Sequence, residues 1–233
     1  MTKKEKTFKN SVFSNIIEGD IEGLLDSSSD SSENKKDKEN LPELLPILTI
    51  KNTVLFPGVL IPITISRKSS EALVKSLKGK KKCLGVLAQK NKETKDPEFS
   101  DLYQVGTVAR LIKVLNHPDS SGTTAIIQGV ERFKVEEEVQ QKPFLKARVT
   151  YLEEEEASLK NKGVKALSES VKDTAISILQ LNTNIPQEAQ SAFEAIENPN
   201  FLVRFIASNM DLDVKAKQEL LEINDFTERA TIL

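Results

Sequence analysis

The sequence LPILTIKNTVLFPGVLIPI, residues 45–63, decides the fold of this chain of 233 residues. Two apolar runs rich in β-branched residues, Pro46–Ile50 and Leu60–Ile65, flank the turn Phe56-Pro57-Gly58. β-Branched side chains favour strands, and a Pro-Gly pair is typical of a tight turn. The stretch therefore predicts a strand, a turn and a second strand at the start of the folded part of the chain.

The sequence after this stretch predicts more strands, as far as residue 153. Short apolar or alternating runs indicate strands at Cys83–Ala88, Gly106–Leu115, Thr123–Gln128, Arg132–Val139 and Phe144–Tyr151. One helix, Ser69–Leu77, is expected between them, because its apolar residues share one helical face. Residues 41–153 are therefore expected to form a β-rich subdomain.

The period of the apolar residues changes from 2 to 3.6 after the acidic run Glu153–Glu156. A stripe from Val164 to Leu179 predicts one long helix, and a second is expected at 187–196. Asn198 before Pro199 is a strong start signal for a third helix, which we expect to end near residue 209.

Aspartates mark the starts of two more helices. Asp211 or Asp213 is expected to cap the fourth, and Asp225 with Glu228 has capping-box spacing for the fifth. The pattern then stops at Leu233 without a C-terminal cap. Residues 157–233 are therefore expected to form a helical subdomain that is truncated at a connecting helix.

Composition separates the first 40 residues from the rest. They hold 7 Lys/Arg and 9 Asp/Glu, which leaves 26 of each in the remainder and argues against a broad nucleic-acid footprint. Residues 1–40 are predicted to be a disordered tail, because Ser-rich charged sequence buries too little apolar surface. Within the tail, residues 13–25 carry apolar positions at near-helical spacing. They predict either a transient amphipathic turn or a docking helix for a partner.

The sequence indicates a soluble, cytoplasmic protein. Cys83 is the single cysteine, which fits a reducing compartment. No apolar run approaches the roughly 18 residues of a membrane span, and no apolar core follows the N-terminal lysines as in a secretory signal.

A search for reactive or phosphate-binding motifs finds none. G-x-x-x-x-G-K-[ST] and G-x-G-x-x-G are both missing, and His117 is the single histidine. We interpret His117 as a turn residue, Cys83 as a core residue on a strand, and the run Lys78–Lys82 as a solvated loop. The acidic runs Glu136–Glu138 and Glu153–Glu156 are likewise expected to be solvated, and no catalytic or metal-binding residues are predicted.

An ordered set of motifs resembles the N-terminal domain of the Lon proteases. Its opening is Leu45-Pro46-Ile47 with 51–58 and Ile61-Pro62-Ile63, and Arg67-Lys68 matches a basic position, although Ser66 replaces the usual Gly. The other matches are Gly85–Lys90, Asp101–Arg110 (DLYQVGTVAR), Gln128–Phe133, Pro143–Ala147, Asn198-Pro199 and Lys217–Glu222. The match covers about 41–233, and the tail matches nothing.

This resemblance implies both a fold and a function. The implied fold is α+β, with a β-rich PUA-like pseudo-barrel at 41–153 and an α-helical bundle at 157–233. The implied function is substrate recognition and assembly within an ATP-dependent serine protease of protein quality control, which is hexameric at full length. Unfolded or degron-bearing proteins are the implied partners, and no membrane or nucleic acid is expected. The ATPase module, with ATP and Mg²⁺, and the Ser-Lys protease module lie elsewhere in such a protease, so no catalysis and no cofactor are expected here.

The substrate-binding residues implied are Leu55, Phe56, Val59, Leu60, Arg67 and Lys68. Two interpretations of the turn stay open: its apolar side chains are core, or they form a patch that grips unfolded chains, with Phe56 and Leu60 exposed. An alternative function also stays open, namely a free-standing PUA-like binding module that contacts RNA through Lys78–Lys82.

Overall fold

A computed structural model describes residues 41–77, 83–116, 123–181 and 187–233. The strands in these ranges are β1 (Leu44–Ile50), β2 (Leu60–Ile65), β3 (Cys83–Ala88), β4 (Val105–Asn116), β5 (Thr123–Gln140) and β6 (Leu145–Tyr151). The α-helices are α4 (Lys68–Ser76), α5 (Lys162–Leu181), α6 (Gln187–Glu194), α7 (Pro199–Asn209), α8 (Val214–Glu222) and α9 (Phe226–Ile232). The expected α+β class is confirmed, and the finer division into a PUA-like barrel and a helical bundle stays a prediction.

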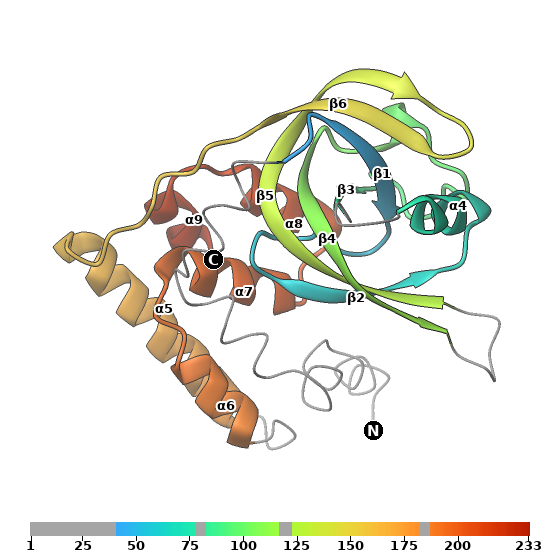
Figure 1. Ribbon diagram of the computed structural model, residues 1–233. Coiled ribbons are helices and arrows are strands. Elements are labelled where there is room, and N and C mark those ends of the chain that lie inside the picture. Colours follow the sequence, from blue (N-terminus) through green and yellow to red (C-terminus); the bar gives the residue numbers. More distant parts are fainter. Residues whose placement is uncertain (1–40, 78–82, 117–122, 182–186) are drawn as a thin grey trace.

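The six strands form one sheet, which is largely closed on itself (Figure 1). Their order is β2-β5-β4-β3-β1-β6, and β6 also pairs with β5, so that five strands complete a ring. β1 and β3 are parallel and the other neighbours are antiparallel. β2 pairs only with the first half of β5, which leaves β2 as an edge strand.

Most predicted elements lie where the sequence places them, with one clear exception. The expected strands 123–128 and 132–139 are a single strand, β5, of 18 residues. Its register shifts against β4 and β6 at several points, so bulges absorb the irregular pattern that suggested two strands.

The helix starts confirm the capping predictions. Asn198 accepts a hydrogen bond from the Phe201 amide at 2.9 Å, and Asp213, rather than Asp211, caps α8. Asp225 accepts from the Glu228 amide at 2.7 Å. These short-range bonds satisfy amides that a helix leaves unpaired at its N-terminus.

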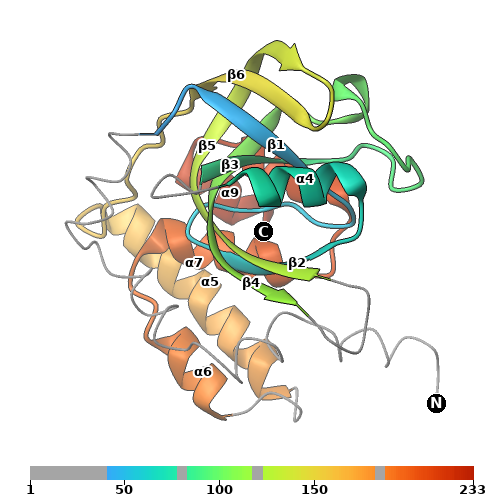
Figure 2. The same ribbon diagram turned by 45° about the vertical axis from the view of Figure 1, so that its right-hand side comes forward.

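The largest hydrophobic core joins the sheet to the helices. It contains Leu48 and Ile61 from the strands together with Phe201, Phe205 and Leu220 from the helices. Helices α7, α8 and α9 pack beside the sheet, whereas α4 lies at another side of it (Figures 1 and 2). Between β1 and β2, this shared core contains Val54, Leu55, Phe56 and Val59, so the turn belongs to the junction of the two parts.

Candidate functional site

The Phe56-Pro57-Gly58 turn is held between the sheet and α7. The Gly58 amide donates to the Gly129 carbonyl, and the Gly129 amide donates to the Val59 carbonyl, both at 2.9 Å. Gly58 has φ +81°, and a Cβ added there would lie 2.8 Å from Cδ2 of Phe201 on α7. The turn therefore needs glycine for its backbone conformation and for the approach of the Phe201 ring.

Phe56 is buried, with 1% of its surface exposed, so of the two interpretations left open for the turn, the core interpretation holds for this side chain. Leu55 and Val59 are also buried in the shared core. Thr107 Oγ1 donates to the Leu55 carbonyl at 2.6 Å, and a Cβ on Gly129 would lie 2.3 Å from the Phe56 carbonyl oxygen. The backbone of the turn thus contacts strands that are distant in sequence. The side chains of Leu55, Phe56 and Val59 belong to the core.

The remaining residues of the predicted substrate site do not gather around the turn. Arg67 donates to Thr49 and to the Gln89 side chain, which ties the start of α4 to β1 and to the residue after β3. Burial lowers the pKa of Arg67, and Asp96 opposes this shift. Lys68 is exposed and Leu60 is half-buried. The six residues therefore do not form one surface.

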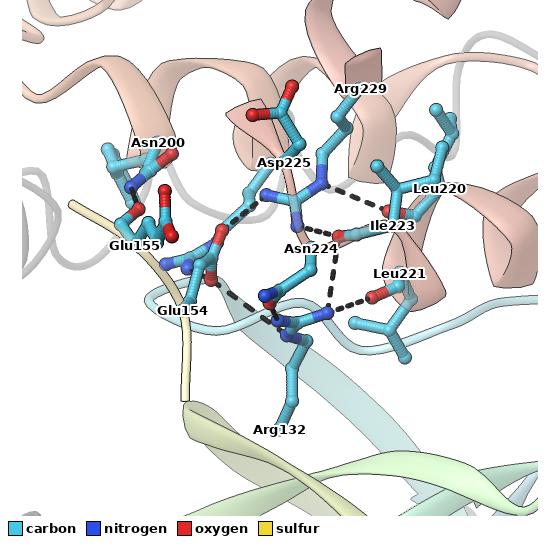
Figure 3. A network of polar contacts seen from close by, with 12 residues as sticks. Arg132, Glu154, Glu155, Asn200, Leu220, Leu221, Ile223, Asn224, Asp225 and Arg229 are labelled. Atoms are coloured by element: carbon cyan, nitrogen blue, oxygen red, sulfur yellow. Dashed lines mark hydrogen bonds and ion pairs between the residues drawn. The ribbon is translucent and has the colours of Figure 1, made fainter. Parts of the chain in front are cut away.

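A buried carboxylate, Glu154, lies where the sheet meets the helices (Figure 3). Its side chain is 6% exposed, and it contacts three guanidinium groups. Arg229 Nη1 of α9 donates to Oε1 at 2.6 Å, Arg204 of α7 donates to Oε2, and Arg132 Nε of β5 lies 3.8 Å from Oε2. We call these four residues the Glu154 cluster; it joins β5, the segment after β6, α7 and α9.

Two of these arginines also bind the C-terminal end of α8. Arg132 Nη1 donates to the Leu221 and Ile223 carbonyls at 3.0 and 3.2 Å, and its other amino group donates to the Asn224 side chain. Arg229 Nε donates to the Leu220 carbonyl at 3.1 Å. The last carbonyls of a helix lack partners within the helix and carry partial negative charge, so cations are favoured there.

Burial lowers the pKa of each guanidinium group in the cluster. The pKa falls to about 10 for Arg132 and Arg229 and to about 9 for Arg204. Repulsion from Arg229 adds to the effect of burial at Arg132 and Arg204, whereas Glu131 opposes it at both. All three groups stay charged at neutral pH, and the carboxylate and the α8 carbonyls offset part of this positive charge.

The expectation that the run Glu153–Glu156 is solvated is wrong for Glu154. Its neighbours in the run carry the same side chain, so the sequence holds no signal that singles it out. Arg132 lies in the motif Gln128–Phe133 that resembles the Lon family, but the motif did not predict that this arginine would be buried or paired. The cluster connects the sheet to the helices through buried ion pairs.

An accessible surface with several apolar side chains lies on the ribbon formed by β2, the first half of β5 and the second half of β4. The strand register places nine residues on the same face of this ribbon: Leu60, Pro62, Thr64, Thr124, Ile126, Gln128, Arg110, Lys113 and Leu115. None of the nine is buried. On the opposite face, Ile61, Ile127 and Leu111 are buried in the shared core. We call the accessible side the ribbon face.

The ribbon face combines apolar side chains with positive charge. Leu60, Leu115 and Ile126 are half-buried, yet none of them is among the side chains that pack against the cores of the described residues. Pro62 suits an edge strand, because it has no amide to donate. Ile112, at a register shift of β4, is 47% exposed beside this face.

Other residues noted in the sequence offer little chemistry. His117 and the run Lys78–Lys82 lie outside the described residues. Cys83 is half-buried at the start of β3 and packs against the sheet core. Among the described residues there is no group of three or more His, Cys, Asp or Glu that could hold a metal ion. No helix in the described ranges is long and apolar enough to cross a membrane.

Comparison with known proteins connects this architecture to one family. Residues 44–233 match the family model described as the ATP-dependent protease La (LON) substrate-binding domain. Over 192 residues the chain is 47% identical to the Lon protease of Cytophaga hutchinsonii, and the aligned region covers 82% of this chain and 24% of that protein. Over 190 residues it is 44% identical to the Lon protease of Flavobacterium johnsoniae, covering 82% and 23%. The chain thus spans about a quarter of the length of these relatives.

Solved structures support the fold independently. The N-terminal domain of a Mycobacterium avium complex Lon protease superposes with a TM-score of 0.66 at 21% identity, and 81% of this chain and 95% of that one are covered. A Lon N-terminal domain protein from Xanthomonas campestris gives 0.56 at 17% identity, with the same coverage.

Proposed function

The chain belongs to the LON substrate-binding domain family, and we propose on that premise that it captures unfolded or degron-bearing polypeptides for an ATP-dependent Lon-type protease. In this proposal the chain recognises substrate and takes part in assembly, as a hexamer in the full-length protease. Hydrolysis of ATP and of peptide bonds belongs to other modules. The family description of a substrate-binding domain supports recruitment.

The ribbon face is the observation that carries this proposal. Unfolded chains differ from folded ones by their accessible apolar side chains, so a surface that recognises them must itself be apolar and accessible. Leu60, Ile126 and Leu115 meet both conditions. Of the six residues named from the sequence, Leu60 is the one on this face, and we propose it as a contact. Leu55, Phe56 and Val59 act indirectly, because they support the strand that presents it.

The proposal can be tested with a variant that makes the ribbon face polar. In Leu60→Ser with Ile126→Thr, two half-buried apolar side chains are replaced without touching the core. If each apolar side chain buries roughly half of its surface against the substrate, losing that burial at both positions would weaken binding by about 1–2 kcal/mol in total, or roughly 5- to 30-fold. Binding is measured by fluorescence anisotropy with fluorescein-labelled lysozyme that has been reduced and carboxymethylated, so that it stays unfolded.

A matched control makes the same substitutions at exposed positions away from the ribbon. Leu159 and Ile178 are 46% and 62% exposed, so Leu159→Ser with Ile178→Thr should bind the probe as the parent does. Circular dichroism and urea unfolding check that both variants stay folded. Equal affinity of the ribbon variant and the parent would refute the assignment of substrate binding to this face.

A further inference from the structure

The ribbon face has a charge as well as an apolar character. Arg110 and Lys113 are the charged members among its nine residues, and both are basic. A ligand that matches this face would therefore carry apolar side chains interspersed with carboxylates. Electrostatic complementarity of this kind selects among apolar ligands and speeds their association.

One segment of the chain has this composition. Residues 13–25, FSNIIEGDIEGLL, contain six large apolar residues and the acidic residues Glu18, Asp20 and Glu22, with no Lys or Arg. The segment precedes the residues that match the family model, which begin at 44. It is therefore not accounted for by the function of the matched domain.

The connection to the folded part is long enough for the segment to reach the ribbon. Residues 26–41 span up to about 50 Å when extended. A folded part of this size has a diameter of about 40 Å, estimated from the usual relation of chain length to radius of gyration. A ligand on so short a tether has an effective concentration in the millimolar range, so weak affinity is enough for high occupancy.

We propose that residues 13–25 bind the ribbon face of their own chain and compete there with unfolded substrates. This inference rests on the proposed function of the ribbon face. The apolar residues of the segment contact Leu60, Ile126 and Leu115, and its carboxylates lie near Lys113. The tail thus lowers the apparent affinity of the domain, and a substrate must displace it.

The first experiment removes the competitor from the full chain. In Ile16→Ser with Ile21→Ser the tail keeps its length and charge but loses two apolar residues. If the tail binds with a dissociation constant on the order of 0.1 mM, the variant should bind the labelled unfolded lysozyme up to about tenfold more tightly than the parent. Phe8→Ser with Val12→Ser is the matched control, since it makes two similar changes outside the segment and should leave the affinity unchanged.

The second experiment locates the binding site. A fluorescein-labelled peptide of residues 11–27 should bind the full-length tail variant, and Leu60→Ser with Ile126→Thr should weaken that binding at least fivefold. Lys113→Glu should weaken it as well, whereas Lys215→Glu on α8, also exposed, should not. Peptide affinity that is indifferent to the ribbon substitutions overturns the proposed site.

The outcomes separate this inference from the proposed function. If the ribbon substitutions weaken binding of the unfolded lysozyme but the tail substitutions leave it unchanged, the ribbon face binds substrate and the tail inference is wrong. The ribbon substitutions weaken the competing tail as well as the substrate, so this comparison is made in the tail variant Ile16→Ser with Ile21→Ser. If the ribbon substitutions leave lysozyme binding unchanged there, the proposed function of the face fails instead, whatever the peptide does.

Discussion

Replacing Gly58 by alanine tests whether the turn is a packed junction. Gly58 has φ +81°, where an alanine costs about 1–2 kcal/mol relative to glycine. The new Cβ would also lie 2.8 Å from Phe201 Cδ2, inside the normal contact distance. Such overpacking in a core usually costs about 1–3 kcal/mol. We therefore expect Gly58→Ala to lower the free energy of unfolding by about 2–5 kcal/mol.

Urea unfolding followed by circular dichroism measures this loss directly. The melting temperature should fall by roughly 5–15 °C, from the usual relation for a folded part of this size. Gly163→Ala is the matched control. Gly163 lies in the first turn of α5, and a Cβ there would meet only the exposed Asn161 side chain, at 3.3 Å. This control should change stability by less than about 1 kcal/mol.

A double-mutant cycle separates backbone strain from the clash. Phe201→Leu removes the ring that approaches Gly58, so the double variant should be more stable than the sum of the single losses predicts, by about 1 kcal/mol or more. A loss below 1 kcal/mol for Gly58→Ala would refute the junction. Strict additivity with Phe201→Leu would show that the ring does not limit the space.

Two further predictions concern buried ionisable groups. Glu154→Gln should lower the free energy of unfolding in urea by about 3–5 kcal/mol, because it leaves buried arginines without their carboxylate. The control Glu137→Gln changes an exposed ion pair and should alter the free energy of unfolding by less than about 1 kcal/mol. Similar losses for the two variants would contradict the role of the Glu154 cluster. Burial raises the pKa of Tyr151 and Tyr103, so the contribution of both to stability is complete below pH 10 and declines as pH rises further. The phenolate absorbance at 295 nm should accordingly develop at higher pH in the folded chain than in 8 M urea, and superimposable curves would contradict the burial of these rings.

The contacts of the Glu154 cluster bear on the proposed capture of substrate. The turn that precedes β2 contacts α7 at Gly58, and the second half of β5 is bonded to the end of α8 through Arg132. Both links use buried contacts, which are costly to break one at a time. The ribbon face is therefore held at a fixed orientation to α7 and α8, and we expect a captured chain to be presented in a defined direction.

The local pattern of the sequence predicts most elements because their signals are short-range. Alternation over a few residues indicates the strands, and Asn198-Pro199, Asp213 and Asp225 start helices through bonds that reach three residues. The expected two strands at 123–139 failed for the same reason: local pattern registers a bulge as an interruption, whereas the continuous pairing with β4 makes one strand.

The sequence by itself determined that 45–63 is a strand, a turn and a strand, and by resemblance which family it opens. It did not determine which side chains face water. Phe56 is core because α7, about 145 residues later, covers the turn, and Glu154 is buried because arginines from three separate elements surround it. Burial is a property of contacts between distant segments, so only the tertiary structure decided that the turn is a junction and that Leu60, Leu115 and Ile126 are accessible together on the ribbon face.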